Sequence, residues 1–300
     1  MAGRFAPSPT SALHLGNLRT ALVAWLLARS TGREIRLRIE DLDTLRVAAA
    51  GDVARGQLTD LAALGIEFDL PVIWQSERLD AYSAALAGLD TYECFCTRRE
   101  IAEAASAPHG NGYRPYPGTC RSLTASRRAE LTATRRPAIR IRAHGATSTV
   151  TDLWAGEVTG VVDDFVLVRN DGVPAYNLAV VVDDLAMGVD QVVRGDDLLS
   201  SSPRQAWLAG RLGGVAPTYA HVGLAVNPHG QRLAKRDGAV TLADLAALGV
   251  PASAVLARLA VSLELAECGE QVTIGGLLDR FDPLRMPRHP WVVEGAWQPC

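Results

Sequence analysis

Hydrophobic and polar residues follow a regular pattern at the start of the chain. Gly3 to Ala6 predict a short strand, and a loop with two prolines follows. From Leu15 to Gly32, apolar residues recur every three or four positions, which predicts a helix. Residues 35–40 alternate between apolar and charged side chains, as in a strand. Strand, loop, helix and strand form a βαβ unit, so we expect an α/β fold with a parallel sheet.

The periodicity of the remaining chain predicts further elements. Residues 52–64 and 77–90 favour helices, and so does the segment from Leu198 to Leu212. Strands are expected at Ile139–Arg142, Phe165–Val168, Ala179–Val182, Val189–Arg194 and Tyr219–Leu224. Residues 91–120 interrupt this rhythm, so we expect an insertion there. After residue 240 the pattern favours a small helical region.

Composition narrows the classes of protein. A net charge of -3 argues against a broad surface that wraps nucleic acid, although paired arginines allow a local basic groove. The first apolar run, Ala21 to Ala28, is too short and too late for an export signal, and no run approaches the length of a membrane helix. Five cysteines are an odd number and do not resemble a disulfide framework. We therefore expect a soluble, cytoplasmic protein without a membrane partner. We also expect a monomer.

Lys235 is the only lysine of the chain, because 29 of the 30 basic residues are arginine. An ammonium kept at one position points to a site where a wide, planar guanidinium cannot replace it. A surface lysine kept by chance is the alternative. The residues around Lys235 must decide between the two.

Residues 4–17 contain the first group with candidate chemistry. The loop leads to His14, Gly16 and Asn17 at the start of the predicted helix. A helix N-terminus favours anions through its unpaired N–H groups and its dipole, and His14 and Asn17 can donate hydrogen bonds to phosphate. The alternative is a histidine that only caps the helix.

Residues 232–236 contain the second group, with Arg232, Lys235 and Arg236 between Gly230 and Gly238. Cations between flexible glycines suit a lid that closes over a polyphosphate, where an ammonium stabilises charge on the transferring phosphate. A solvated basic turn is the alternative.

Together these segments resemble the paired signatures of class I aminoacyl-tRNA synthetases. Residues 14–17 resemble the HIGH motif and residues 232–236 the KMSKS motif, while residues 4–10 and 38–43 resemble the glutamyl branch. The resemblance covers roughly residues 3–240. It departs from the motifs at Asn17, which can still form hydrogen bonds, and at Ala234, which lacks the hydroxyl of the usual serine.

The resemblance implies a fold and a division of the chain. The fold is a Rossmann-like, doubly wound parallel sheet with a zinc-containing insertion and a small helical C-terminal region. Residues 1–90 would form the first half of the catalytic domain, 91–121 the insertion, 122–240 the second half and 241–300 the C-terminal region. The resemblance also implies that His14, Gly16, Asn17 and Lys235 bind ATP together with Mg²⁺, and that His14 and Lys235 are catalytic.

A glutamate pocket needs cationic sites for two carboxylates and an acidic or polar site for the ammonium. Arg4 and Glu40 end the first two strands, so both reach the crevice at the carboxyl edge of a parallel sheet. We expect Glu40 to bind the ammonium and arginines to bind the carboxylates. The resemblance implies this set of glutamate-binding residues: Arg4, Phe5, Ala6, Pro7, Ser8, Glu40, Tyr176 and Arg194. The alternative for Arg194 is an ion pair with Asp196 or Asp197.

Cys94, Cys96 and Cys120 lie in the irregular insertion. Three thiols there fit a structural zinc better than a disulfide, and a closed tetrahedral site needs a fourth ligand. His109 is the ordinary chemical choice. Resemblance to the truncated paralogues of glutamyl-tRNA synthetase favours Tyr116 instead, with ordinary buried thiols as a further alternative.

Only 64 residues follow Arg236, too few for the helical anticodon-binding region of a full glutamyl-tRNA synthetase. This length resembles the truncated paralogues, which activate L-glutamate without tRNA and esterify queuosine in the anticodon loop of tRNA(Asp). The resemblance therefore implies ATP, L-glutamate and tRNA(Asp) carrying queuosine as partners. Two alternatives are a nucleotidylyltransferase without a tRNA partner and a catalytically inactive binding module.

Overall fold

A sheet of seven strands forms the centre of the computed structural model, which describes residues 1–97, 99–101, 115–233 and 240–294. The strands, in spatial order, are β3 (Asp69–Trp74), β2 (Glu34–Ile39), β1 (Ala2–Phe5), β9 (Val189–Gly195), β10 (Thr218–Val222), β6 (Thr147–Asp152) and β7 (Gly156–Val161). All neighbours are parallel except β6 and β7, which form an antiparallel hairpin at one edge. The predicted α/β fold with a mostly parallel sheet is confirmed.

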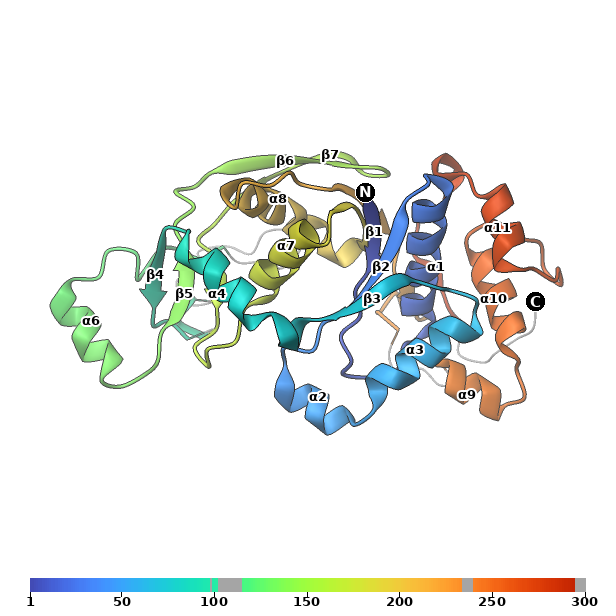
Figure 1. Cartoon of the computed structure of the whole chain (residues 1–300), viewed down its shortest axis with the longest axis horizontal. Helices are drawn as coiled ribbons and strands as arrows, with labels where there is room; N and C mark the ends of the chain where they lie inside the picture. Colours follow the sequence, from blue (N-terminus) through green and yellow to red (C-terminus); the bar gives the residue numbers. More distant parts are fainter. Residues whose placement is uncertain (98, 102–114, 234–239, 295–300) are drawn as a thin grey trace.

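Helices cover both faces of this sheet (Figure 1). On one face α1 (Leu15–Ser30) packs against α10 (Ala252–Ser262) and α11 (Ile274–Arg280). On the other face α7 (Tyr176–Ala186) packs against α8 (Ser202–Arg211) and α4 (Leu79–Ala87). Each face has its own hydrophobic cluster. Because α1 contacts the sheet as well as α10 and α11, it is buried almost all round rather than along one stripe.

The remaining helices and turns connect these layers. After β2 come α2 (Thr44–Ala50) and α3 (Val53–Ala63), and 3-10 turns lie at Gln75–Arg78, Asp196–Ser201 and Pro283–Arg285. Beyond residue 240 the chain forms α9 (Leu242–Ala247), α10 and α11. It then returns as β12 (Trp291–Val292), which pairs in parallel with β11 (Ala225–Val226). Residues after 240 therefore share the hydrophobic core of α1.

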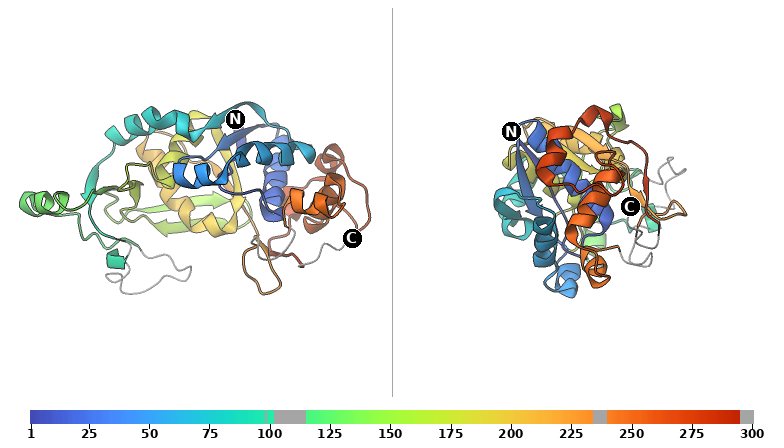
Figure 2. Two further views of the ribbon diagram at one scale, coloured as in Figure 1. Left: turned by 90° about the horizontal axis from the view of Figure 1, so that it is seen from below. Right: turned by 90° about the vertical axis from the view of Figure 1, so that its right-hand side faces the viewer.

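A second, smaller sheet lies at the far end of the molecule, beyond α4 and next to α6 (Ala125–Thr132) (Figures 1 and 2). It consists of β4 (Thr91–Cys94), β5 (Ala138–Ile141) and β8 (Val166–Val168), all antiparallel. Two of the predicted strands, β5 and β8, thus belong to this small sheet rather than to the main sheet, and β5 pairs with the start of the insertion.

One predicted strand is wrong. Residues Ala179–Val182 lie inside α7, where Leu178, Ala179, Val180 and Val181 are all buried. The helix is enclosed by α4, α8, β8 and β9, so apolar residues occur on consecutive positions. A short continuous apolar run does not distinguish a buried helix from a buried strand. The β6–β7 hairpin was not predicted.

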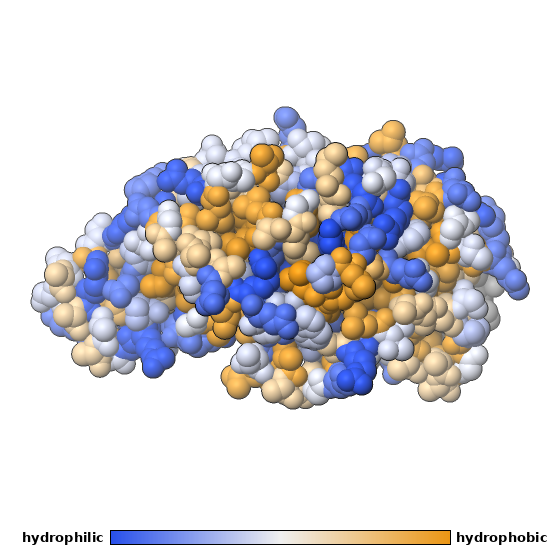
Figure 3. Space-filling model, in the orientation of Figure 1, coloured by the Kyte–Doolittle hydropathy of each residue, from blue (hydrophilic) through white to orange (hydrophobic). Residues whose placement is uncertain are grey.

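Within the described ranges, none of the helices combines the length and apolar character that crossing a bilayer requires. The face shown in Figure 3 intersperses hydrophilic with hydrophobic residues.

Candidate active site

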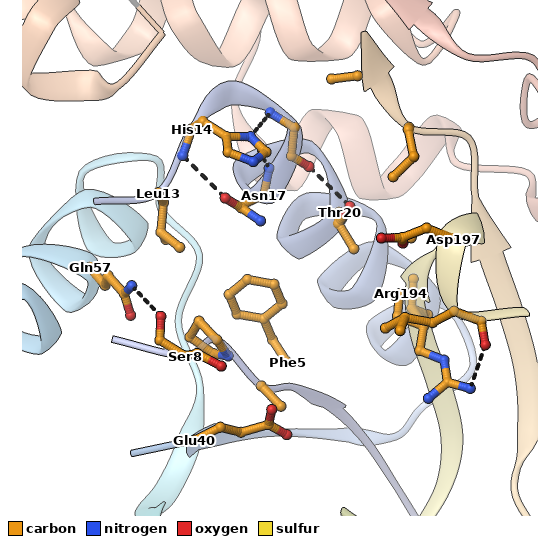
Figure 4. Close-up of a pocket in the computed structure, with 18 of the residues that line it drawn as sticks. Phe5, Ser8, Leu13, His14, Asn17, Thr20, Glu40, Gln57, Arg194 and Asp197 are labelled. Carbon is orange, nitrogen blue, oxygen red and sulfur yellow. Dashed lines mark hydrogen bonds between the residues drawn. The ribbon is translucent and has the colours of Figure 1, made fainter. Parts of the chain in front are cut away.

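A cavity of about 470 Å³ opens at the carboxyl ends of β1, β2 and β9, next to the N-terminus of α1 (Figure 4). All the predicted ATP-binding and glutamate-binding residues that the structure describes line it: Arg4, Phe5, Ala6, Pro7, Ser8, His14, Gly16, Asn17, Glu40, Tyr176 and Arg194. Arg232 lines it too, whereas Ala234 and Lys235 lie outside the described residues. The structure therefore brings together segments that are far apart in sequence.

His14 caps α1 with its side chain. Its Nδ1 accepts hydrogen bonds from the Gly16 N–H (3.1 Å) and the Asn17 N–H (3.3 Å), and its own N–H donates to the Asn17 Oδ1 (3.2 Å). Burial, and then the charge of Arg232, lower the pKa of His14 to about 4. The ring is therefore neutral at pH 7. Because Nδ1 is an acceptor, the ring hydrogen lies on Nε2.

The first four N–H groups of α1 all have protein partners. Leu15 donates to the Val240 carbonyl (2.8 Å), Leu18 to the His14 carbonyl (3.1 Å), and Gly16 and Asn17 to the His14 ring. The prediction that unpaired N–H groups of this helix bind an anion is thus wrong for this conformation. Donors for an anion are side-chain groups instead, above all the His14 Nε2–H.

Gly16 has a packing role in this arrangement. A Cβ atom at position 16 would lie 2.8 Å from the Ala225 Cβ and 3.0 Å from the His14 ring. Real Cβ atoms do not approach other atoms so closely. Glycine therefore lets β11 and the capping ring lie against the first turn of α1.

A buried network of charges connects two residues that line the cavity, Arg4 and Glu40, with Arg38 and Asp184 behind them. Arg38 is fully buried and donates to the Asp184 Oδ1 (2.6 Å) and the Glu40 Oε1 (3.1 Å). Arg4 donates to the Val193 carbonyl (3.1 Å) and lies 3.5 Å from the Asp184 carboxylate. Burial raises the pKa of Glu40, and the charges of Arg38 and Arg4 oppose this rise. A ligand ammonium beside Glu40 would favour its ionised form further.

Arg194 is buried at the end of β9, and its guanidinium donates only to neutral groups. The acceptors are the His221 Nε2 (3.0 Å), Gln205 Oε1 (2.7 Å), Ser202 Oγ (2.8 Å), Leu198 carbonyl (3.3 Å) and Tyr176 hydroxyl (3.4 Å). The alternative of an ion pair with Asp196 or Asp197 is not formed, and Asp197 pairs with Arg232 at 2.8 Å. Among the described residues, no carboxylate pairs with Arg194, so its charge is not offset by one. All five of its N–H groups have these neutral acceptors, so a ligand carboxylate must replace one of them.

Several residues of this site escaped the sequence analysis. Gln57, 1% exposed, donates to the carbonyls of Ser8 (3.1 Å) and Ser11 (2.8 Å) and so fixes the loop that carries Ser8. Arg38 was visible only as part of a motif, although it lies in β2 two residues before Glu40, so both side chains point to the same side of the extended chain. His221 and Asp152 lie behind Arg194 and had no sequence signal of their own. His221 is a polar residue in the predicted strand β10, and Asp152 ends β6, which was not predicted.

The three predicted thiols lie together in the insertion, with Sγ atoms all within 4.8 Å of one another. The Tyr116 hydroxyl lies 3.4 Å from the Cys94 Sγ and 3.7 Å from the Cys96 Sγ, and Cys96 and Cys120 are 3.5 Å apart. A tetrahedral zinc with bonds of about 2.3 Å to sulfur and about 2.0 Å to oxygen needs S···O edges of about 3.5 Å and S···S edges of about 3.8 Å.

The three thiols therefore suit a metal ion, and the Tyr116 oxygen lies beside them. The guanidinium of Arg140 lies 3.7 Å from the centre of the Tyr116 ring, while burial raises the pKa of the phenol. His109, the other candidate ligand, lies outside the described residues.

Comparison with known proteins gives consistent results. A family model described as "tRNA synthetases class I (E and Q), catalytic domain" matches residues 1–292. The chain is 61% identical to the glutamyl-Q tRNA(Asp) synthetase of Cutibacterium acnes over 90% of this chain and 78% of that protein. It is 56% identical to that of Nocardia farcinica over 99% of this chain and 95% of that protein.

Solved structures agree with these relatives. A glutamate tRNA ligase from Elizabethkingia meningosepticum, in complex with its amino acid, superposes with a TM-score of 0.80 at 28% identity, covering 99% of this chain and 67% of that one. A methionyl-tRNA synthetase from Mycobacterium tuberculosis (TM-score 0.52, 14% identity, covering 88% of this chain and 64% of that one) shares the fold. On the family match and these identities, the chain belongs to the glutamyl-Q tRNA(Asp) synthetases, ligase-type enzymes with a class I aminoacyl-tRNA synthetase catalytic domain.

Proposed function

We propose that this enzyme uses ATP to convert L-glutamate into glutamyl-adenylate and then transfers the glutamyl group to the queuosine base of tRNA(Asp). The observation that carries the first step is the uncompensated guanidinium of Arg194 in the same cavity as His14. A carboxylate can bind to the guanidinium of Arg194, and a phosphate can accept a hydrogen bond from His14. The acceptor is supported by the names of the relatives.

Glutamate binding follows from the charges that line the cavity. Glu40 accepts from the ammonium, while Arg4 and Arg194 provide the cationic sites. The α-carboxylate must face ATP in order to react, so the side-chain carboxylate takes the buried arginine site. Ser8 and Tyr176 contribute hydroxyl groups beside it. Asp184 already offsets part of the charge of Arg4, so Arg194 contributes more to binding a carboxylate.

Activation takes place at the opposite wall. The Nε2–H of His14, the amide of Asn17 and the ammonium of Lys235 hold the ATP phosphates, with Gly16 keeping His14 in place. Mg²⁺, when bound with ATP, offsets the charge of the phosphates. An oxygen of the α-carboxylate attacks the α-phosphorus and the bond to pyrophosphate breaks. A hydroxyl of the queuosine cyclopentene ring then attacks the activated carbonyl, and AMP leaves.

A structural zinc ion, one per chain, belongs to the same proposal. Cys94, Cys96 and Cys120 would bind it as thiolates and Tyr116 through its oxygen, closing the tetrahedron without a free position. Such an ion would hold the ends of the insertion together rather than take part in the reaction.

Exchange of labelled pyrophosphate into ATP tests the activation step. We expect exchange that requires glutamate and needs no tRNA, reduced at least about a hundredfold by Lys235→Ala because the lost ammonium stabilises transition-state charge. Arg127→Ala removes an exposed charge on α6 and should leave the rate unchanged.

Two results would contradict this account. Exchange without dependence on glutamate would favour the nucleotidylyltransferase, and no exchange at all would favour the inactive binding module. Full exchange by Lys235→Ala would remove Lys235 from the ATP site while leaving the glutamate pocket in place.

A further inference from the structure

Three neighbouring strands end in polar residues directly behind the candidate glutamate site. Arg194 lies near the end of β9, and the parallel pairing with β10 places His221 beside it. On the other side of β10, Tyr219 pairs with Asp152 at the end of β6. The order β9, β10, β6 therefore brings Arg194, His221 and Asp152 into one row at the carboxyl edge of the sheet.

The hydrogen bonds along this row run in one direction. The Arg194 Nε always carries a hydrogen and donates it to the His221 Nε2 at 3.0 Å, so Nε2 must be an acceptor. The hydrogen of the neutral ring is then on Nδ1, which donates to the Asp152 Oδ2 at 2.6 Å. The Asp152 Oδ1 accepts from the N–H groups of Trp154 (2.9 Å) and Ala155 (2.8 Å).

The electrostatics of the row explain why a histidine separates the two charges. The side chains of His221 and Asp152 are 2% and 0% exposed, so a carboxylate touching Arg194 directly would cancel its charge in a medium where charges are poorly screened. The imidazole keeps Asp152 one ring away. Burial lowers the pKa of His221, which keeps the ring neutral, and the Tyr219 ring stacks against it at 5.9 Å.

We propose that Asp152 and His221 are positioning residues that fix the guanidinium of Arg194 for the side-chain carboxylate of glutamate without neutralising it. This rests on the proposed function, in which Arg194 binds glutamate. The arrangement selects a substrate that brings its own negative charge. Glutamine, which is isosteric but neutral, leaves the buried charge uncompensated.

Asp152→Asn is the most specific variant. One amide oxygen can still accept from Trp154 and Ala155, while the amide NH₂ faces the His221 Nδ1. That nitrogen must then accept, so the ring hydrogen moves to Nε2 and meets the Arg194 Nε–H, donor against donor. We expect the KM for glutamate to rise at least about tenfold, with kcat and the KM for ATP changed less than about threefold.

Two substitutions of His221 form a matched pair. In His221→Gln the side-chain oxygen reaches the position of Nε2 and can accept from Arg194, so the KM for glutamate should stay within about threefold of the unmutated enzyme. In His221→Asn the shorter amide reaches the position of Nδ1 and keeps only the contact with Asp152. This variant should resemble Asp152→Asn.

The experiment combines glutamate-dependent ATP–pyrophosphate exchange with the ¹⁵N chemical shifts of the His221 ring. The unmutated enzyme should show the hydrogen on Nδ1, and Asp152→Asn should show it on Nε2. If Asp152→Asn lowers the melting temperature but leaves the KM for glutamate unchanged, or if the unmutated enzyme carries the ring hydrogen on Nε2, the positioning role of Asp152 and His221 is wrong while the proposed function stands. If the unmutated enzyme shows no glutamate-dependent exchange, the proposed function is wrong, and so is glutamate as the ligand that these residues serve.

Discussion

His14 is at the same time a helix cap and a cavity-lining side chain. Its Nδ1 binds the N–H groups of Gly16 and Asn17, so the cap requires an unprotonated nitrogen there. The same requirement leaves the hydrogen on Nε2 for a ligand. Structure and proposed chemistry therefore need one and the same protonation state of this ring.

The pH dependence of stability tests this state. The pKa of His14 in the folded protein is about 4, below the ordinary value of 6.5. Between these values the unfolded chain binds more protons, so the contribution of His14 is present above about pH 6.5 and is lost as the pH falls through about 4. NMR titration of the ring measures the pKa directly.

His14→Asn is the matched control, because asparagine is also a good N-cap and does not titrate. The free energy of unfolding should fall more steeply between pH 6.5 and pH 4 in the unmutated protein than in this variant. Titration of His14 near 6.5 would contradict the assigned capping role.

Sequence motifs identified single residues that line the cavity, but they did not identify the residues that hold these side chains in place by hydrogen bonds. Arg194 was predicted from its segment, while Asp152 and His221 lie 69 residues apart and meet only through the order of β9, β10 and β6. The same holds for Gln57, which fixes the Ser8 loop from α3. Such partners depend on the tertiary arrangement of strands and helices, which cannot be inferred from a single sequence.

At the scale of elements, local periodicity predicted β2 and α1 correctly, because apolar residues alternate with charged ones in β2 and recur every three or four positions in α1. It failed in α7, where the consecutive apolar residues at Ala179–Val182 resemble a buried strand. The N-terminus of α1 shows a second limit, because the rule that helix ends bind anions does not account for a cap that already occupies them.

The insertion provides a prediction at this scale. Cys94, Cys96, Cys120 and Tyr116 join both ends of the segment from β4 to the turn before α6, in a small hydrophobic cluster of their own. We expect one zinc ion per chain by elemental analysis, and its loss in Cys120→Ser because a serine hydroxyl is a poor ligand for zinc.

Cys268→Ser is the matched control, since Cys268 is exposed and is not one of the clustered thiols. It should retain the metal in full. Tyr116→Phe separates the two candidate ligands: reduced zinc affinity supports the tyrosine, whereas unchanged affinity would favour His109. A metal-free unmutated protein would contradict the zinc site.

At the scale of the whole molecule, the parallel sheet explains why one cavity contains both candidate sites. The carboxyl ends of β1, β2 and β9 converge there, which is where ligands of open parallel sheets bind. Helices on both faces hold this edge rigid. The strand β4, which carries the first cysteine of the cluster, lies towards one end of the long axis, so the proposed metal site and the cavity are spatially separate (Figures 1 and 2).

The parallel sheet was predicted from local periodicity, and the residues that line the cavity were predicted from short motifs and their resemblance to a known family. The acceptor has no comparable local pattern. A near-neutral chain with clustered arginines is compatible with a small stem-loop, but charge alone does not specify a nucleotide. The proposed acceptor therefore rests on the names of relatives rather than on residues of this chain.

The most direct test supplies labelled glutamate and ATP with tRNA(Asp) that either carries or lacks queuosine, and then locates the label. The account predicts a glutamyl ester on the queuosine base of the modified tRNA and no label on the unmodified tRNA. Periodate oxidation of the terminal adenosine should not block the labelling. Label on the terminal adenosine, or equal labelling with and without queuosine, would contradict it.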